Sequence, residues 1–87
     1  MPTETVRVTV AHDEYTLIGD GVYKIAMRPH DGTNFRLVIA PSLPAAGTVD
    51  YFPITVSGFA LTDLESADKV YLLADGGADC DVAVMRG

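Results

Sequence analysis

Short stretches of alternating apolar and polar residues run along most of the chain and constrain its fold more than any other feature. Near the amino terminus Val6, Val8 and Val10 alternate with polar residues. Residues two apart in a strand lie on one face of a sheet, so this pattern predicts a strand with one buried side. Similar stretches recur to the carboxyl terminus, separated by Gly, Pro and Asp, which favour turns. We therefore predict one all-β domain over residues 1–87, a small antiparallel β-sandwich or jelly-roll-like fold.

About seven strands are expected from this pattern. They are Glu4–Val10, Tyr15–Ile18, Val22–Arg28, Phe35–Ala40, Tyr51–Val56, Lys69–Ala74 and Cys80–Met85. The last two flank Asp75-Gly76-Gly77, and this spacing predicts a closing hairpin. Segment 57–68 is the least strand-like, and the spacing of Leu61 and Leu64 would suit one helical turn.

The middle of the chain gives three more specific predictions. The strand Phe35–Ala40 is apolar on both faces, which favours a central position in a sheet or cover by another subunit. The segment Pro41–Gly47 has two prolines and small residues, and we expect a structured loop that crosses between the sheets. Pro53 lacks an N–H donor and places its strand at an edge or a bulge.

Size and cysteine content favour self-association. A chain of 87 residues buries a modest share of its surface and has a thin stability margin. The lone Cys80 cannot form an internal disulfide, and its alternation with Val82 and Val84 predicts a packed core position. A homo-oligomer or a bound ion would supply the stabilisation that small domains often gain from disulfides.

The charge balance excludes two classes of partner. Twelve acidic residues against six basic ones give a net charge of −6, which opposes binding to nucleic acid and to anionic membrane surfaces. No apolar stretch approaches the ~18 residues that span a bilayer, and no signal-peptide pattern opens the chain. We expect a protein that accumulates in the cytoplasm where it is made, with no nucleic-acid or membrane partner.

Two sets of polar residues are candidate sites. Asp75, Asp79 and Asp81 beside two glycines could offer oxygen ligands to Ca²⁺, although the spacing fits no EF-hand loop. The simpler interpretation is a solvated turn whose acidic residues oppose edge aggregation. His12 and His30 each neighbour a carboxylate, but both lie at expected turns. With no nucleophile elbow, metal-protease or phosphate-loop motif in the chain, we expect neither an enzyme nor a cofactor.

Exposed apolar and aromatic positions are the better candidates for function. The interface candidates are Pro41, Leu43 and Pro44 in the proline-rich loop and Phe59 and Leu61 further on. The seven Phe and Tyr residues could instead line a carbohydrate platform, although the chain contains no Trp.

The layout as a whole resembles the small β-sandwich virion proteins of tailed bacteriophages. The resemblance rests on the stretches "VYKIAMRP", "FRLVIAPSLPAAG" and "YFPITVSG", and on the closing "ADKVYLLADGGADCDVAVMRG". It implies a non-enzymatic structural protein of the virion, most simply a capsid decoration or cement protein that binds the major capsid protein, or another virion protein, in many copies. The alternatives are a receptor- or carbohydrate-binding module, or a subunit of a neck or tail fibre. The family type offers no catalytic residues to carry over.

Overall fold

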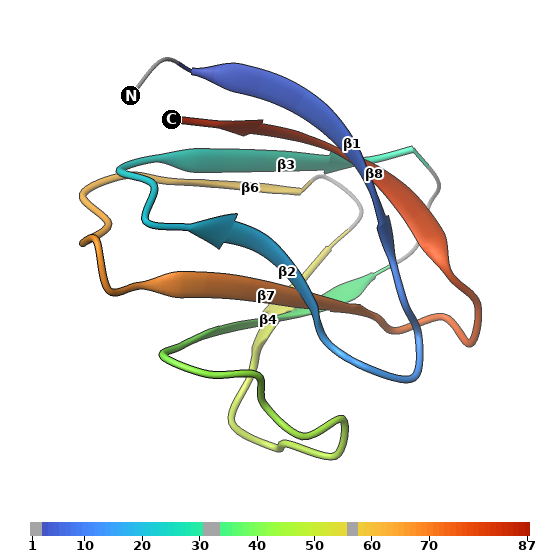
Figure 1. Cartoon of the computed structure of the whole chain (residues 1–87). Coiled ribbons are helices and arrows are strands. Elements are labelled where there is room, and N and C mark those ends of the chain that lie inside the picture. Colours follow the sequence, from blue (N-terminus) through green and yellow to red (C-terminus); the bar gives the residue numbers. More distant parts are fainter. Residues whose placement is uncertain (1–2, 31–33, 56–57) are drawn as a thin grey trace.

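The chain forms a sandwich of two four-stranded sheets in the computed structural model, which describes residues 3–30, 34–55 and 58–87 (Figure 1). The strands are β1 (Glu4–Val10), β2 (Thr16–Asp20), β3 (Ile25–Pro29), β4 (Phe35–Ala40), β5 (Phe52–Ile54), β6 (Phe59–Leu61), β7 (Lys69–Ala74) and β8 (Cys80–Arg86). Sheet I has the order β1-β8-β3-β6, and sheet II has the order β2-β7-β4-β5. None of the residues described forms a helix that could cross a membrane.

The strand pairs are nested, which makes the topology that of a jelly roll. β1 pairs with β8, β2 with β7, β3 with β6 and β4 with β5, and every pairing is antiparallel. Sheet I is completed by the β3–β8 pairing and sheet II by the β4–β7 pairing. Two four-stranded antiparallel sheets of this kind are the architecture called a jelly roll. The prediction of a small all-β sandwich or jelly-roll-like domain is confirmed.

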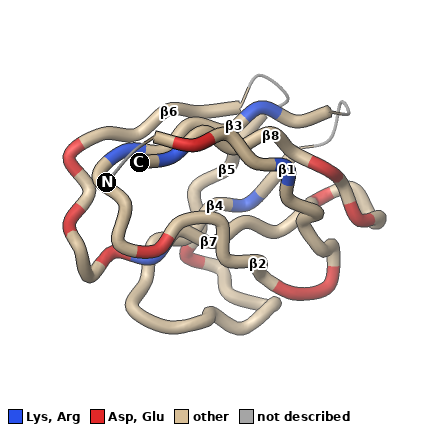
Figure 2. The backbone as a smooth tube through the Cα atoms, turned by 45° about the horizontal axis from the view of Figure 1, so that its top comes forward, with Lys and Arg blue, Asp and Glu red and all other residues tan. Residues whose placement is uncertain are grey.

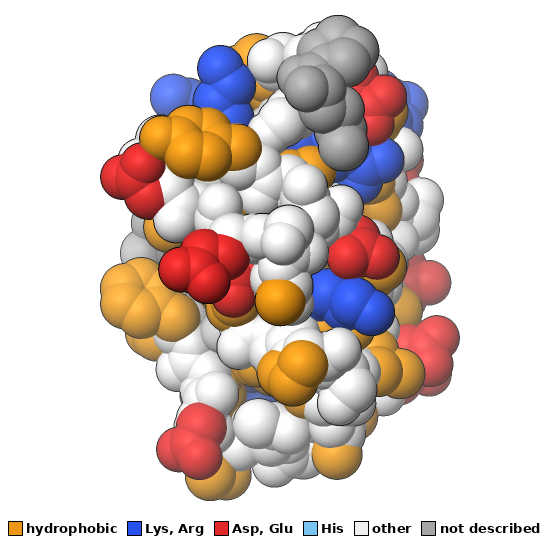
Figure 3. Space-filling model, turned by 60° about the vertical axis from the view of Figure 1, so that its left-hand side comes forward, with side chains coloured by type: hydrophobic (Ala, Val, Ile, Leu, Met, Phe, Trp, Pro, Cys, Tyr) orange, Lys and Arg blue, Asp and Glu red, His pale blue; other side chains and the backbone are white. Residues whose placement is uncertain are grey.

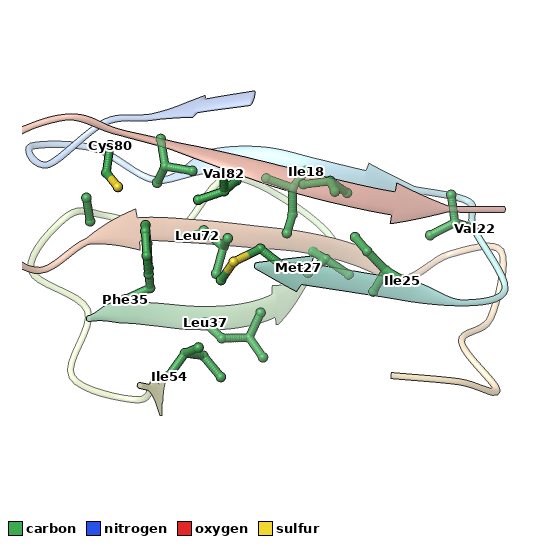
Figure 4. Close-up of a cluster of buried hydrophobic side chains, with 14 residues drawn as sticks. Ile18, Val22, Ile25, Met27, Phe35, Leu37, Ile54, Leu72, Cys80 and Val82 are labelled. Carbon is green, nitrogen blue, oxygen red and sulfur yellow. The ribbon is translucent and has the colours of Figure 1, made fainter. Parts of the chain in front are cut away.

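The core lies between the sheets and follows from the alternation in the sequence (Figure 4). Met27 and Val84 are opposite each other in sheet I, and Leu37 and Leu72 are opposite each other in sheet II. All four side chains are at most 6 % exposed. Cys80 is also buried here, as its alternation with two valines predicts. Burial of such side chains is worth about 1.5–3 kcal/mol each.

The outer faces of the two sheets differ. On sheet II, Tyr15, Tyr71 and Leu73 are buried and pack with Val38 and Ala40 into a second apolar layer. The connection 41–51 lies beyond sheet II, on the side away from sheet I (Figure 1). Sheet I carries no such layer among the described residues, so its outer face is open to solvent.

The closing hairpin prediction is wrong. Lys69–Ala74 and Cys80–Arg86 are strands, but β7 belongs to sheet II and β8 to sheet I. Both long sides of β7 are already occupied, by β2 and β4, so β8 cannot pair with it. The residues between them therefore carry the chain from one sheet to the other. A turn signal in the sequence marks a reversal of direction, and the pairing is decided by which strands are already neighbours.

The prediction that Pro41–Gly47 crosses between the sheets is also wrong, because the connection 41–51 joins β4 to β5, which are neighbours in sheet II.

The predicted helical turn is replaced by β6, and the structure therefore has eight strands rather than seven. The third strand begins at Ile25 rather than at Val22, and just before it the N–H groups of Tyr23 and Lys24 both donate to the carbonyl of Gly87. The central position of β4 and the edge position of Pro53 are confirmed. Val56, the predicted end of the fifth strand, and Asp31, the carboxylate beside His30, lie outside the described residues.

Candidate interaction surface

An apolar groove runs along the open side of the sandwich, where the edge strands of the two sheets face each other. We call it the edge groove. It is a hollow of about 380 Å³, and its apolar walls come from Leu37, Val38, Ile39, Phe52, Ile54, Phe59 and Leu61, with Asp50 as the charged lining residue. Ile39 is 44 % exposed and Phe52 is 66 % exposed. Exposed apolar side chains gathered in one hollow are typical of an interaction site.

The groove stays open because β5 and β6 are short edge strands of different sheets. Phe52 pairs with Leu37 in register, so its side chain is on the inner side of sheet II. β5 is the last strand of that sheet, and β6 is the last strand of sheet I. Among the described residues, neither strand has a further neighbour to cover the gap. Pro53 removes one N–H donor from β5 and so discourages a further strand from pairing there.

The outer face of sheet I forms a second exposed surface, which we call the open face. One row of residues crosses all four strands in register: Thr5, Met85, Ala26 and Ala60. Small side chains leave two shallow hollows along this row, of about 490 and 170 Å³. The open face consists of Thr5, Arg7, Thr9, Lys24, Ala26, Arg28, Ala60, Asp81, Ala83 and Met85.

Strand β6 belongs to both surfaces. Phe59 lines the larger hollow of the open face and also the edge groove, and Leu61 lines the smaller hollow and the same groove. The two surfaces are therefore continuous around β6. Figure 3 shows the side of the molecule that lies on the left in Figure 1. There, by contrast, hydrophobic side chains are separated by polar and acidic ones.

The structure brings together only part of the predicted interface set. Phe59 and Leu61 are half-buried in the edge groove. Pro41 and Leu43 are exposed and Pro44 is half-buried in the connection 41–51, and none of the three lines the groove.

The interface set predicted from the sequence lacks Ile39 and Phe52, although Phe52 is one of the aromatic residues considered for a carbohydrate platform, and it does not include the residues of the open face. The available signal for Phe52 was its neighbour Pro53: a strand confined to an edge leaves its side chains partly uncovered. No comparable signal marks Ile39, because its exposure depends on where β5 stops: β5 pairs with β4 only as far as Leu37, two residues before Ile39.

The three carboxylates of the calcium hypothesis have separate partners. Asp75 pairs with Arg36 at 3.3 Å, Asp79 with His12 at 2.7 Å, and Asp81 accepts a hydrogen bond from the Thr9 hydroxyl at 2.7 Å. The part of the chain that the structure describes has one cluster with several metal-ligating groups, and it consists of His12, Asp13 and Asp79, all exposed. The structure does not gather the predicted set.

His12 links two connections of the chain through Asp79. Its backbone N–H donates to Asp79 Oδ1 at 3.1 Å, and its Nδ1 lies 2.7 Å from the same oxygen. This hydrogen bond raises the pKa of His12 and lowers the pKa of Asp79. The bond ties the β1–β2 connection to the β7–β8 connection. His30 also reaches the β8 region, where its backbone N–H donates to the Asp81 carbonyl at 3.0 Å.

Comparisons of the chain with protein-family models, with curated proteins and with solved structures find no match. Jelly rolls occur in viral capsid proteins and in lectins, so the fold is compatible with both classes and decides neither. The edge groove and the open face are the features from which a function can be argued.

Proposed function

We propose that this protein is a non-enzymatic structural protein of a bacteriophage virion, a decoration or cement protein that binds the assembled head in many copies. The observation that carries the proposal is the edge groove, with Phe52 and Ile39 exposed in a hollow of about 380 Å³. In this view an apolar side chain of the major capsid protein, or of another virion protein, fills the groove.

Binding of this kind would stabilise both partners. A protein that binds only the assembled particle shifts the equilibrium toward assembly by mass action. Many identical sites on one particle allow each contact to be modest, because the contributions accumulate over the lattice. A homo-oligomer on the particle would raise the number of simultaneous contacts further.

The arrangement of the polar groups is compatible with a role without catalysis. The imidazole of His12 is held by Asp79, and both side chains are exposed to solvent. A general base works next to a nucleophile and in a site from which water can be excluded. The thiol of Cys80 is buried in the core between the two sheets.

A receptor- or carbohydrate-binding module on a fibre is the second candidate, and one observation favours it. The edge groove contains two phenylalanines, Phe52 and Phe59, on which a sugar ring could stack. Sugar hydroxyls also require polar partners, and Asp50 is the charged residue that the groove offers. The decoration role is therefore the better fit to this lining.

The test compares Phe52→Asp with Val49→Asp on particles from a source phage whose copy of this gene has been deleted. Both wild-type side chains are exposed, at 66 % and 82 %, but Phe52 lines the groove and Val49 does not. We expect the wild-type chain and Val49→Asp to coat the particles, and Phe52→Asp to bind at least about 30-fold more weakly, the loss of one interface hot spot. Because Phe52 is exposed, its variant should unfold at nearly the wild-type temperature.

Two results would contradict the proposal. One is the absence of this chain from wild-type particles purified on a density gradient. The other is saturable glycan binding by the isolated domain that Phe52→Asp abolishes, together with no binding to the particles, which would establish the second candidate instead.

A further inference from the structure

The open face gathers basic side chains on a strongly acidic protein. Arg7 and Arg28 flank Ala83 in one row of sheet I, since each pairs with Ala83 in register. Lys24 lines the smaller hollow on the same side as Ala26. These are three of the six basic residues in a chain whose net charge is −6. Figure 2 shows the acidic residues mainly in the connections at the ends of the strands.

These three cations have no ion pair within the described ranges 3–30, 34–55 and 58–87. Two other basic residues do have carboxylate partners: Arg36 pairs with Asp75, and Arg86 with Glu4. The acidic residue on the open face is Asp81, which accepts a hydrogen bond from the Thr9 hydroxyl. The face therefore carries a local positive charge that the carboxylates of the described residues do not neutralise through ion pairs.

An apolar strip lies between the cations. Ala26, Ala60 and Met85 lie in one row, with Ala83 in the next. Met85 is 51 % exposed. Small side chains on a sheet let a second flat surface approach closely, and the strip continues around β6 into the edge groove. An apolar centre with charged groups around it is the usual composition of a protein–protein interface.

The charges decide between possible occupants. Two copies stacked open face to open face would bring two sets of Arg7, Lys24 and Arg28 together, and like charges across an interface cost several kcal/mol. A nucleic acid would satisfy the cations but would leave the apolar strip without a partner, and the net charge of −6 repels it. A protein surface with carboxylates around an apolar centre satisfies both features.

We propose that the open face docks onto a flat, acidic surface of a different protein. Carboxylates of that protein lie opposite Arg7, Lys24 and Arg28, and its apolar side chains cover the strip that contains Ala26 and Met85. The inference rests on the proposed function, because it names the chemistry of the partner in the particle.

The first test uses the two lysines of the chain, Lys24 and Lys69, with a water-soluble carbodiimide that joins an amine to a carboxylate in direct contact. Lys24 is on the open face, whereas Lys69 is half-buried in β7 of sheet II. The reagent is applied to purified particles and to the producing cells, and the joined peptides are identified by mass spectrometry. We expect Lys24 to be joined to Asp or Glu residues of one other protein, and Lys69 not to be. The absence of Lys24 products, or Lys24 joined mainly to a second copy of this chain, would overturn the inference.

The second test compares two double variants with the same change in net charge. Arg7→Gln with Arg28→Gln removes two charges from the open face, and Ser42→Glu with Ala46→Glu adds two negative charges to exposed positions in the connection 41–51. On gene-deleted particles at low salt, we expect the first variant to bind about tenfold more weakly and the second to bind like wild type. Equal loss in both would mean that net charge alone matters, and it would refute docking through the open face.

The two proposals can fail separately. If the particles contain no copy of this chain, the proposed function fails, and the cross-linking in producing cells still decides whether Lys24 meets an acidic protein. If the chain coats the particles but the arginine variant binds normally, the function stands and the open face is not the contact. Retention of double-stranded DNA by the wild-type chain, lost in the arginine variant, would overturn the protein partner in favour of a nucleic acid.

Discussion

Replacement of Gly58 by alanine should be far more damaging than the same replacement at Gly77. Both glycines have the left-handed backbone conformation, with φ of 80° and 79°. They differ in their surroundings. A Cβ at Gly58 would overlap the carbonyl oxygen of Met27, whereas nothing lies within 4 Å of a Cβ at Gly77. The carbonyl belongs to β3, which pairs with both β6 and β8.

The two positions separate conformational strain from steric overlap. Alanine in the left-handed conformation costs about 1–2 kcal/mol, and Gly77→Ala should lose no more than this. Gly58→Ala adds the displacement of a strand backbone, for which overpacking in well-packed regions gives roughly 1–3 kcal/mol more. A domain of this size has a total stability of about 4–13 kcal/mol, so the change at Gly58 removes a large part of it.

Thermal unfolding, followed by circular dichroism, measures the difference. For a domain of this length, 1 kcal/mol corresponds to roughly 4–8 °C in Tm, so the two variants should be separated by roughly 4–24 °C. Since Gly58 directly precedes β6, Gly58→Ala should also weaken the particle binding that we propose for the edge groove. Equal destabilisation at the two glycines would refute the reasoning, because it would show that β6 moves away from Met27 without cost.

Three further outcomes follow from the core and from the polar contacts. Leu72→Ala removes a fully buried side chain between the sheets and should cost about 2–5 kcal/mol in urea denaturation; a loss below about 1 kcal/mol would mean that the core collapses around the cavity. The pKa of His12 is raised and that of Asp79 is lowered, so the ion pair between them stabilises the fold below the ordinary His pKa of 6.5. This stabilisation is lost as the pH rises through the raised pKa of His12. It is also lost as the pH falls through the lowered pKa of Asp79. His12→Ala should therefore lower Tm at about pH 5.5 and have little effect at about pH 8.5, and an equal effect at both would contradict the ion pair. Arg86 donates to the Ile18 carbonyl at 2.6 Å, and Arg86→Met should cost about 1–3 kcal/mol in urea denaturation at neutral pH, whereas an unchanged midpoint would show that water replaces the contact.

The sequence predicts the strands well and their partners poorly. The alternation of Cys80, Val82 and Val84 with other residues is enough to predict β8 and its buried side. The alternation does not indicate which strands lie beside β8, because these neighbours are formed by residues more than fifty positions away. The apparent hairpin at residues 75–79 shows the difference: the turn residues and both strands are present, but β7 is flanked by β2 and β4.

Part of the candidate site was predictable from the sequence. Phe59 and Leu61 are predicted as exposed apolar positions, and Pro53 marks β5 as an edge, where an open side is expected. The open face was not predictable, because alanines at positions 26, 60 and 83 carry no signal until the register places them in adjacent rows.

The nesting of the strand pairs sets an order of loop closures that bears on how the chain folds. β4 and β5 are the innermost pair, and β3–β6, β2–β7 and β1–β8 enclose it in turn. If the inner pairs form first, each later pair closes a loop that is already shortened, so the entropy of closure is lost in small steps. The outermost pair then forms last, and sheet I cannot be completed until β8 has left the ribosome. We expect destabilising changes in β4 to slow folding and comparable changes in β1 mainly to speed unfolding.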